Sequence, residues 1–166
     1  MRKIILVLVV LCSCKQSNKE VNDLFDKANE KFYDGKYESA IKDLNKVIEI
    51  NPDRVLAYNI RGFCKHGLDN NRGAIEDFTK AIEIDSNYLM AYVGRGLVKI
   101  RIKNYRNAIK DFNMAIEIDP DYALTYRGRG VGKLKLGNKN EACLDWYKAK
   151  DLGSITAIKL IKEHCE

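Results

Sequence analysis

The chain has 166 residues, in which 29 lysines and arginines against 23 acidic residues give a formal net charge of +6. This length supports one domain with a sizeable core. The basic residues are interleaved with acidic ones and form no dense cationic run, so we do not expect a nucleic-acid partner. Because the sequence has no glycine-rich phosphate loop, nucleophile elbow or Cys/His dyad, we expect neither an enzyme nor a cofactor.

The N-terminus has the layout of an export signal. Arg2 and Lys3 precede an uninterrupted apolar run over residues 4–11, as in secretory signals. Eight apolar residues in a helix rise about 12 Å, whereas a bilayer core is about 30 Å thick. We therefore expect a signal peptide over residues 1–13 rather than a permanent membrane span.

The end of this run, Leu11-Cys12-Ser13-Cys14, resembles the lipobox of bacterial lipoproteins. The resemblance implies cleavage before Cys14, acylation of this cysteine with chains such as palmitate, and a short tether over residues 14–20. The chain would then be anchored to the bacterial cell envelope, with the outer membrane as the favoured location. The alternatives are a secretory signal without lipid, or a metal or redox pair of Cys12 and Cys14. That pair lacks nearby ligands and the usual two-residue gap.

From residue 21 onward the sequence repeats with a period of 34 residues. Each unit has two apolar helical stripes separated by a turn, and Gly35 and Gly137 in these turns suit the left-handed conformation that ends a helix. Small residues in the first helix, opposite alanines of the second, would let the backbones approach closely, and the large residue of the second helix would fill the space toward the next unit. The recurring series are Ala28, Gly62, Gly96 and Gly130; Ala40, Ala74, Ala108 and Ala142; Leu44, Phe78, Phe112 and Trp146; and Val47, Ala81, Ala115 and Ala149.

These positions resemble the tetratricopeptide repeat, which has this period. Tyr58, Tyr92 and Tyr126 stand where that family often has tryptophan, and Pro52 and Pro120 lie at unit boundaries. The resemblance implies an all-α, right-handed superhelical solenoid of four helix-turn-helix units followed by a capping helix. The predicted units are residues 21–54, 55–88, 89–122 and 123–154, and the predicted cap is 155–166.

Arginines and aspartates recur with the same period. An active site seldom needs the same pair several times, so we interpret these residues as structural ion pairs that bridge the helices. They are Arg61, Arg95 and Arg129 on the first helices, and Asp43, Asp77, Asp111 and Asp145 on the second.

The C-terminal segment predicts a helix with one apolar stripe, capped by Ser154. Such a helix covers the exposed face of a terminal repeat. In an oxidising compartment Cys143 and Cys165 would form a disulfide that fixes this cap, although two small buried thiols are an equal alternative. We expect Cys64 to be a core residue.

In the family that the repeats resemble, the first helices line a concave groove for an extended or helical peptide. The implied groove is apolar in the middle units and basic toward the fourth, which suits hydrophobic anchors followed by an acidic group. The alternative is that about half of these residues are core, and that neighbouring apolar residues form an interface with a second copy. The groove residues are Phe25, Asn29, Asn59, Phe63, His66, Met90, Val93, Leu97, Ile100, Arg101, Arg127, Val131, Leu134 and Lys135.

The Lys/Asn/Arg clamp of chaperone-binding relatives is absent, because Phe25, Ile60, Met90 and Gly94 occupy several of its positions. His66 and His164 are isolated histidines, so no metal site is predicted. The favoured function is a non-enzymatic adaptor, held at a membrane by its lipid anchor and binding a protein or peptide in its groove. The alternative is an architectural subunit of an envelope assembly or secretion complex that uses its outer faces.

Overall fold

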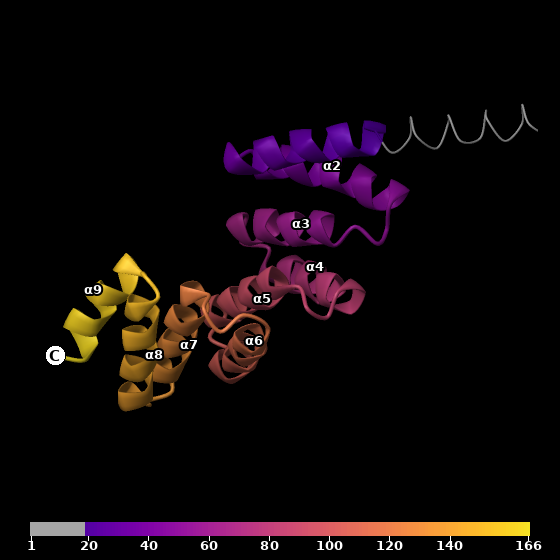
Figure 1. The fold of residues 1–166 in the computed structure, drawn as a ribbon. Coiled ribbons are helices and arrows are strands. Elements are labelled where there is room, and N and C mark those ends of the chain that lie inside the picture. The colour runs from indigo at the N-terminus through magenta and orange to yellow at the C-terminus, as the bar shows by residue number, and fades with distance from the viewer. Residues whose placement is uncertain (1–18) are drawn as a thin grey trace, which may run out of the picture.

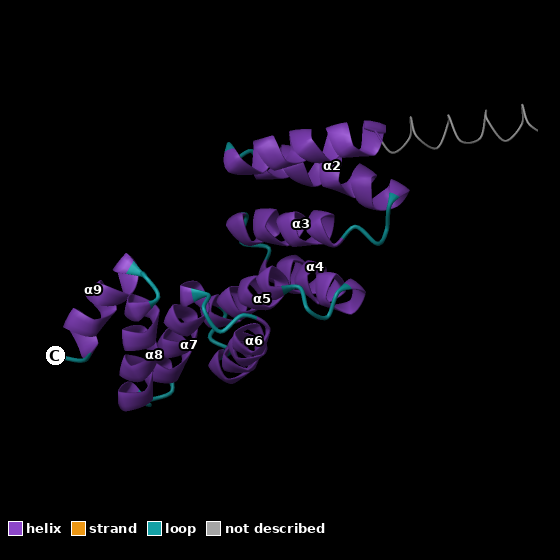
Figure 2. Cartoon of the chain, viewed as in Figure 1, coloured by secondary structure: helices purple, strands orange, loops and turns teal. Residues whose placement is uncertain are grey.

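A computed structural model describes residues 19–166, which form antiparallel helical pairs and, within that range, no strand (Figure 1; Figure 2). The predicted signal peptide, Cys14 and residues 15–18 lie outside the described range. The first described helix covers residues 19–33, so residues 19 and 20, assigned above to the tether, are helical. The further helices are α2 (Tyr37–Ile50), α3 (Val55–Gly67), α4 (Asn71–Ile84), α5 (Leu89–Arg101), α6 (Tyr105–Ile118), α7 (Ala123–Lys135), α8 (Lys139–Asp151) and α9 (Ile155–His164).

The helices pack in chain order into the predicted solenoid. From α2 to α9 each helix contacts the one that follows it, and α5 also contacts both α3 and α7, the first helices of its neighbouring units. Figure 1 shows the resulting curved stack, with the N-terminal pair and α9 at opposite ends. The helices α3, α5 and α7 begin at residues 55, 89 and 123, the first residues of the second, third and fourth predicted units.

The turn inside each unit has one residue in the left-handed region. Gly35 has φ +73° and Gly137 has φ +87°, as their position after a first helix predicts. Asp69 and Lys103 occupy the equivalent places in the two middle units, with φ 60° and 62°. The period of 34 residues therefore extends to the backbone conformation, even at Lys103, whose side chain disfavours this region.

The aromatic residue on the second helix of each middle unit, Phe78 or Phe112, packs between two glycines. The buried ring of Phe78 lies against Gly62 of its own unit and Gly94 of the next, where an added Cβ would approach it to 2.9 and 2.5 Å. Phe112 lies in the same way between Gly96 and Gly128. The prediction that this aromatic reaches toward the next unit is confirmed, but the nearest neighbour of Gly62 is the Phe78 ring rather than an alanine.

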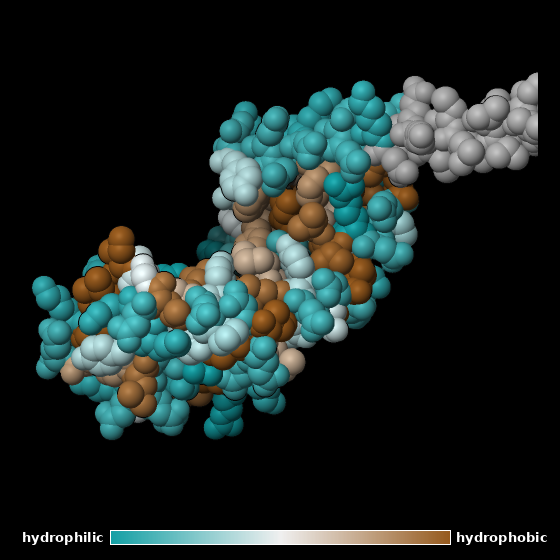
Figure 3. Space-filling model, viewed as in Figure 1, coloured by the Kyte–Doolittle hydropathy of each residue, from teal (hydrophilic) through white to brown (hydrophobic). Residues whose placement is uncertain are grey.

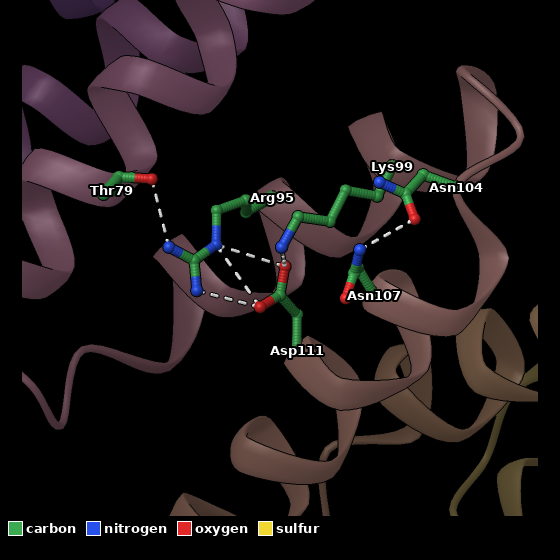
Figure 4. Close-up of polar contacts among 6 residues, drawn as sticks. All are labelled: Thr79, Arg95, Lys99, Asn104, Asn107 and Asp111. Carbon is green, nitrogen blue, oxygen red and sulfur yellow. Dashed lines mark hydrogen bonds and ion pairs between the residues drawn. The ribbon is translucent and has the colours of Figure 1, made fainter.

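The recurring arginines and aspartates form ion pairs between the two helices of a unit. In Figure 4 the Arg95 guanidinium donates to Asp111 from Nε at 3.1 Å and from Nη2 at 2.8 Å, and Lys99 Nζ lies 2.7 Å from the same carboxylate. Arg95 Nη1 also donates to Thr79 Oγ1 at 3.0 Å, on the last helix of the preceding unit. One network therefore joins three helices.

The second and fourth units repeat this arrangement. The arginine–aspartate pairs are Arg61–Asp77 and Arg129–Asp145, and the contacts to the preceding unit are to Asn45 and Asn113. In the first unit Lys27 stands at the arginine position, and Lys31 pairs with Asp43 instead.

The cap α9 packs its buried Ala157 and Ile161 onto α8. A disulfide joins Cys143 to Cys165, whose Cα atoms are 5.8 Å apart. Ser154 stands at the N-cap of α9, but its hydroxyl lies 3.2 Å from Thr156 Oγ1 and makes no capping hydrogen bond to the backbone. Cys64 is a buried free thiol, as predicted, and burial raises its pKa to about 12.

Candidate functional site

An open pocket of about 440 Å³ lies among the first helices of the first three units. The helix over residues 19–33 forms one wall, α3 forms the other, and the residues around the start of α5 close one end. The lining residues are Phe25, Asn29, Phe32, Tyr33, Leu56, Asn59, Ile60, Phe63, Tyr88 and Met90.

The repeat explains how these side chains come together. Phe25 and Asn59 are 34 residues apart and so share one helical position, while Asn29 and Phe63 share a position one turn further along. At these two positions each wall therefore has one phenylalanine and one asparagine on the same helix face, in opposite order. The same two positions in α5 are Val93 and Leu97, so the asparagines are confined to the first two units.

The pocket lining is uncharged and largely apolar. The Phe63 ring packs edge-on against the buried Phe78 ring, with centroids 4.9 Å apart. Phe63 therefore forms a floor of the pocket that the core supports. Tyr33 is 78% exposed and Leu56 is 46% exposed, so apolar surface also faces solvent at the rim. Figure 3 shows apolar side chains gathered over the region of α3, between the more polar surfaces of the N-terminal pair and the C-terminal units.

Asn59 is a buried polar residue within this lining. Its side chain is only 6% exposed, and its Oδ1 has no hydrogen-bond partner. Among the described residues, only Thr125 Oγ1 in α7 shares this state. A buried polar group without a partner destabilises a fold, so an asparagine at this point of the pocket wall is unexpected from stability alone.

Of the fourteen predicted groove residues, Phe25, Asn29, Asn59, Phe63 and Met90 meet in this pocket. Val93 is 1% exposed and packs in a core cluster with Tyr92 and Ala115, so it cannot contact a partner. The half-buried Leu97, Val131 and Leu134 pack against core clusters, and Ile100 is also half-buried. These four residues lie outside the pocket.

The predicted basic end is also partly engaged within the chain. Arg101 pairs with Asp69 and donates from Nη1 to the His66 carbonyl at 3.2 Å, so it ties α5 to the end of α3. His66 Nδ1 lies 3.4 Å from Asn71 Oδ1, and partial burial lowers its pKa. Lys135 is exposed, and the carbonyl of the half-buried Arg127 accepts a hydrogen bond from Trp146.

Five lining residues were not predicted: Phe32, Tyr33, Leu56, Ile60 and Tyr88. The spacing of Leu56, Ile60 and Phe63 is an i, i+4, i+7 stripe, a signal that could have placed the first two on the same face as Phe63. Tyr88 precedes α5 and has no such signal.

The described part of the chain contains no cluster of three His, Cys, Asp or Glu residues that could hold a metal ion. Across residues 19–166 every helix is too short or too polar to cross a membrane. The candidate site is an open, largely apolar pocket on a helical-repeat scaffold.

Comparison with known families agrees with this class. Residues 28–69 match the family described as TPR repeat, and residues 55–88 and 91–122 match the family described as tetratricopeptide repeat. Together these matches cover more than half of the chain. The chain belongs to the tetratricopeptide repeat family. No curated protein sequence matches it.

Several solved structures share the fold. The crystal structure of MamA is 25% identical in sequence, with a TM-score of 0.76 over 83% of this chain and 81% of that one. TTC0263, a thermophilic TPR protein in Thermus thermophilus, is 17% identical with a TM-score of 0.73 over 80% and 74%. The first TPR of Spaghetti (RPAP3), bound to the HSP90 peptide SRMEEVD, is 23% identical with a TM-score of 0.69 over 72% and 94%.

Proposed function

We propose that this chain is a non-enzymatic scaffold that binds a segment of a partner protein in the pocket between the helix over residues 19–33 and α3. The observation that carries the proposal is an open, uncharged pocket whose wall contains a buried asparagine without a partner. The tetratricopeptide fold is itself typical of protein–protein interaction, and one structure that shares it, that of Spaghetti, holds a bound peptide. The buried Phe78 ring behind Phe63 would support a side chain that enters the pocket.

We also propose that acylated Cys14 anchors the chain to a bacterial envelope membrane, with the outer membrane favoured. Two or three acyl chains would hold it almost irreversibly, because each buried CH₂ contributes about 0.8 kcal/mol. Only residues 15–18 separate Cys14 from the first described helical residue. A flexible four-residue tether spans about 11 Å. The pocket, which begins in the first unit, would therefore face a partner close to the membrane.

A second candidate is an architectural subunit that is held through its outer faces. The favouring observation is exposed apolar surface at the C-terminal end, where Leu144, Ile155 and Ile158 lie open to solvent. Leu144 is 69% exposed on α8, far in sequence from the pocket. A partner that covers this end would make the chain a structural element rather than an adaptor.

Matched charge insertions separate the two candidates. Leu56→Glu places a charge at the pocket rim, and Leu144→Glu places one on α8, both at exposed sites that tolerate polar residues. Under the adaptor proposal, affinity capture of crosslinked partners from cells loses its specific partner with Leu56→Glu and keeps it with Leu144→Glu. The reverse pattern supports the architectural candidate.

The anchor has its own test. Mass spectrometry of the mature amino terminus should find an acylated Cys14, and Cys14→Ser should release the chain from the membrane fraction. An intact Met1, or an unmodified Cys14 on a membrane-bound chain, would contradict the lipid anchor.

A further inference from the structure

The chemistry of the pocket limits which segment it can accept. Its lining has no charged side chain, and two of the cations near it are already paired with a carboxylate. Arg61 and Lys65 of α3 both pair with Asp77, and the Arg54 guanidinium lies 4.1 Å from the centre of the Phe25 ring and donates to Asn22. A carboxylate placed here would lose its water without gaining a counter-charge, which is costly.

The two asparagines of the lining, Asn29 and Asn59, favour an uncharged peptide group over a carboxylate. A carboxamide carries one acceptor and two donor hydrogens, which match the N–H and C=O of a peptide group. The Asn59 oxygen is unpartnered and enclosed, and a half-turn of the amide would exchange the oxygen and the nitrogen, so either atom can take the position nearer the pocket. Asn29 lines the same pocket from the opposite helix. A peptide backbone between the two walls would bond to the amide atom of Asn59 that faces it, while the peptide side chain enters the apolar part of the pocket.

The third unit limits how far along the repeats asparagines can contact a peptide backbone. Val93 and Leu97 replace the two asparagines at the equivalent positions of α5, and Val93 is buried in the core. Amide contacts of this kind therefore end after the second unit. The segment that fits is short, with a bulky anchor rather than a long ladder of backbone contacts.

We infer that the pocket recognises a short extended segment with a bulky, uncharged apolar side chain, that Asn59 binds its backbone amide, and that neither an acidic residue nor a free C-terminal carboxylate is needed. This inference rests on the proposed function and specifies its ligand class. It distinguishes this pocket from one that holds an acidic peptide such as SRMEEVD, the ligand in the Spaghetti structure.

The test uses the full chain in phosphatidylcholine nanodiscs, which avoid free detergent in an apolar pocket. Random 12-residue peptides on phage are selected against it, with Leu56→Glu as the counter-selection for pocket-dependent binding. The expected sequences share one bulky aliphatic or aromatic residue with uncharged neighbours. The best synthetic peptide should bind equally as a free acid and as an amide.

Two variants test the role of Asn59, because each removes one of the two unpartnered buried polar atoms found within residues 19–166. Asn59→Leu should weaken the selected peptide about tenfold, and Thr125→Val in α7 should leave its affinity unchanged. Both variants should unfold at or above the temperature of the natural chain. Asn59→Leu should therefore keep or raise the stability and weaken binding. An asparagine with only a structural role would not give this pattern.

The outcomes separate this inference from the proposal beneath it. Selected peptides that share acidic residues or require a free carboxylate, and still depend on Leu56, overturn the inference and leave the proposed pocket in place. Full affinity in Asn59→Leu overturns the assigned role of the amide. A selection in which no peptide depends on Leu56 overturns both.

Discussion

The buried carboxylates between paired helices should be the most sensitive polar positions of the scaffold. Asp111 is nearly buried and receives the Arg95 guanidinium and the Lys99 ammonium, at distances of 2.7 to 3.1 Å. Asp111→Asn keeps the size of the side chain and removes its charge. Two cations, with side chains 17% and 16% exposed, would then share a site without a counter-charge.

The magnitude follows from that burial. Removing one partner of a buried ion pair costs about 3–5 kcal/mol. Because the two cations keep some contact with water, and because the amide oxygen still accepts one hydrogen bond, we expect a loss of about 2–3 kcal/mol in the free energy of unfolding. The matched control is Glu76→Gln, since the exposed Glu76 pairs with exposed Arg72. That change should cost no more than about 0.5 kcal/mol.

The assay is urea unfolding followed by helical circular dichroism, on the natural chain and both variants. The network account requires Asp111→Asn to lower the unfolding free energy several times more than Glu76→Gln. Equal and small losses in the two variants would refute the reasoning, because they would show that the three-helix network contributes no more than a surface pair.

Three further predictions concern a turn, a disulfide and a titrating group. Lys103→Gly should raise the unfolding free energy by about 0.5–1 kcal/mol, because φ is 62° there and glycine adopts this conformation freely; an unchanged urea midpoint would contradict it. Replacing Cys143 and Cys165 by serine should cost about 3 kcal/mol, because the bond closes a loop of about 20 residues; equal melting temperatures for the two forms would show that the cap needs no crosslink. Burial lowers the pKa of His66, so the unfolded chain takes up its proton first as pH falls below about 6.5. The stability that neutral His66 provides is therefore lost on acidification. Between pH 7.5 and 5.5, the His66→Gln variant should lose less unfolding free energy than the natural chain. Equal losses in the two proteins would exclude His66 as the cause.

The sequence predicts the fold well because the same physical requirement occurs four times. A small residue where a ring approaches, an aromatic on the second helix of the later units and a turn at a fixed distance are local features, and the period makes each visible. The period would also have predicted the left-handed turns at Asp69 and Lys103, which lack the glycine that reveals the other two.

The candidate site is less predictable because burial depends on neighbouring units. Val93 and Asn59 occupy equivalent positions, yet one is closed into the core around Ala115 and the other lines an open pocket. The unpartnered state of the Asn59 oxygen has no signal in the sequence, since a partner could have come from any packed helix. Exposed rim residues such as Leu56 are equally ambiguous until the walls are placed.

Site-specific photocrosslinking in cells tests the central claim most directly. A photoreactive phenylalanine analogue is placed at Tyr33 or Leu56, both exposed at the pocket, and at Leu144, exposed on α8. Binding through the pocket predicts one shared protein adduct from positions 33 and 56 and none from position 144. An adduct from position 144 alone would contradict it.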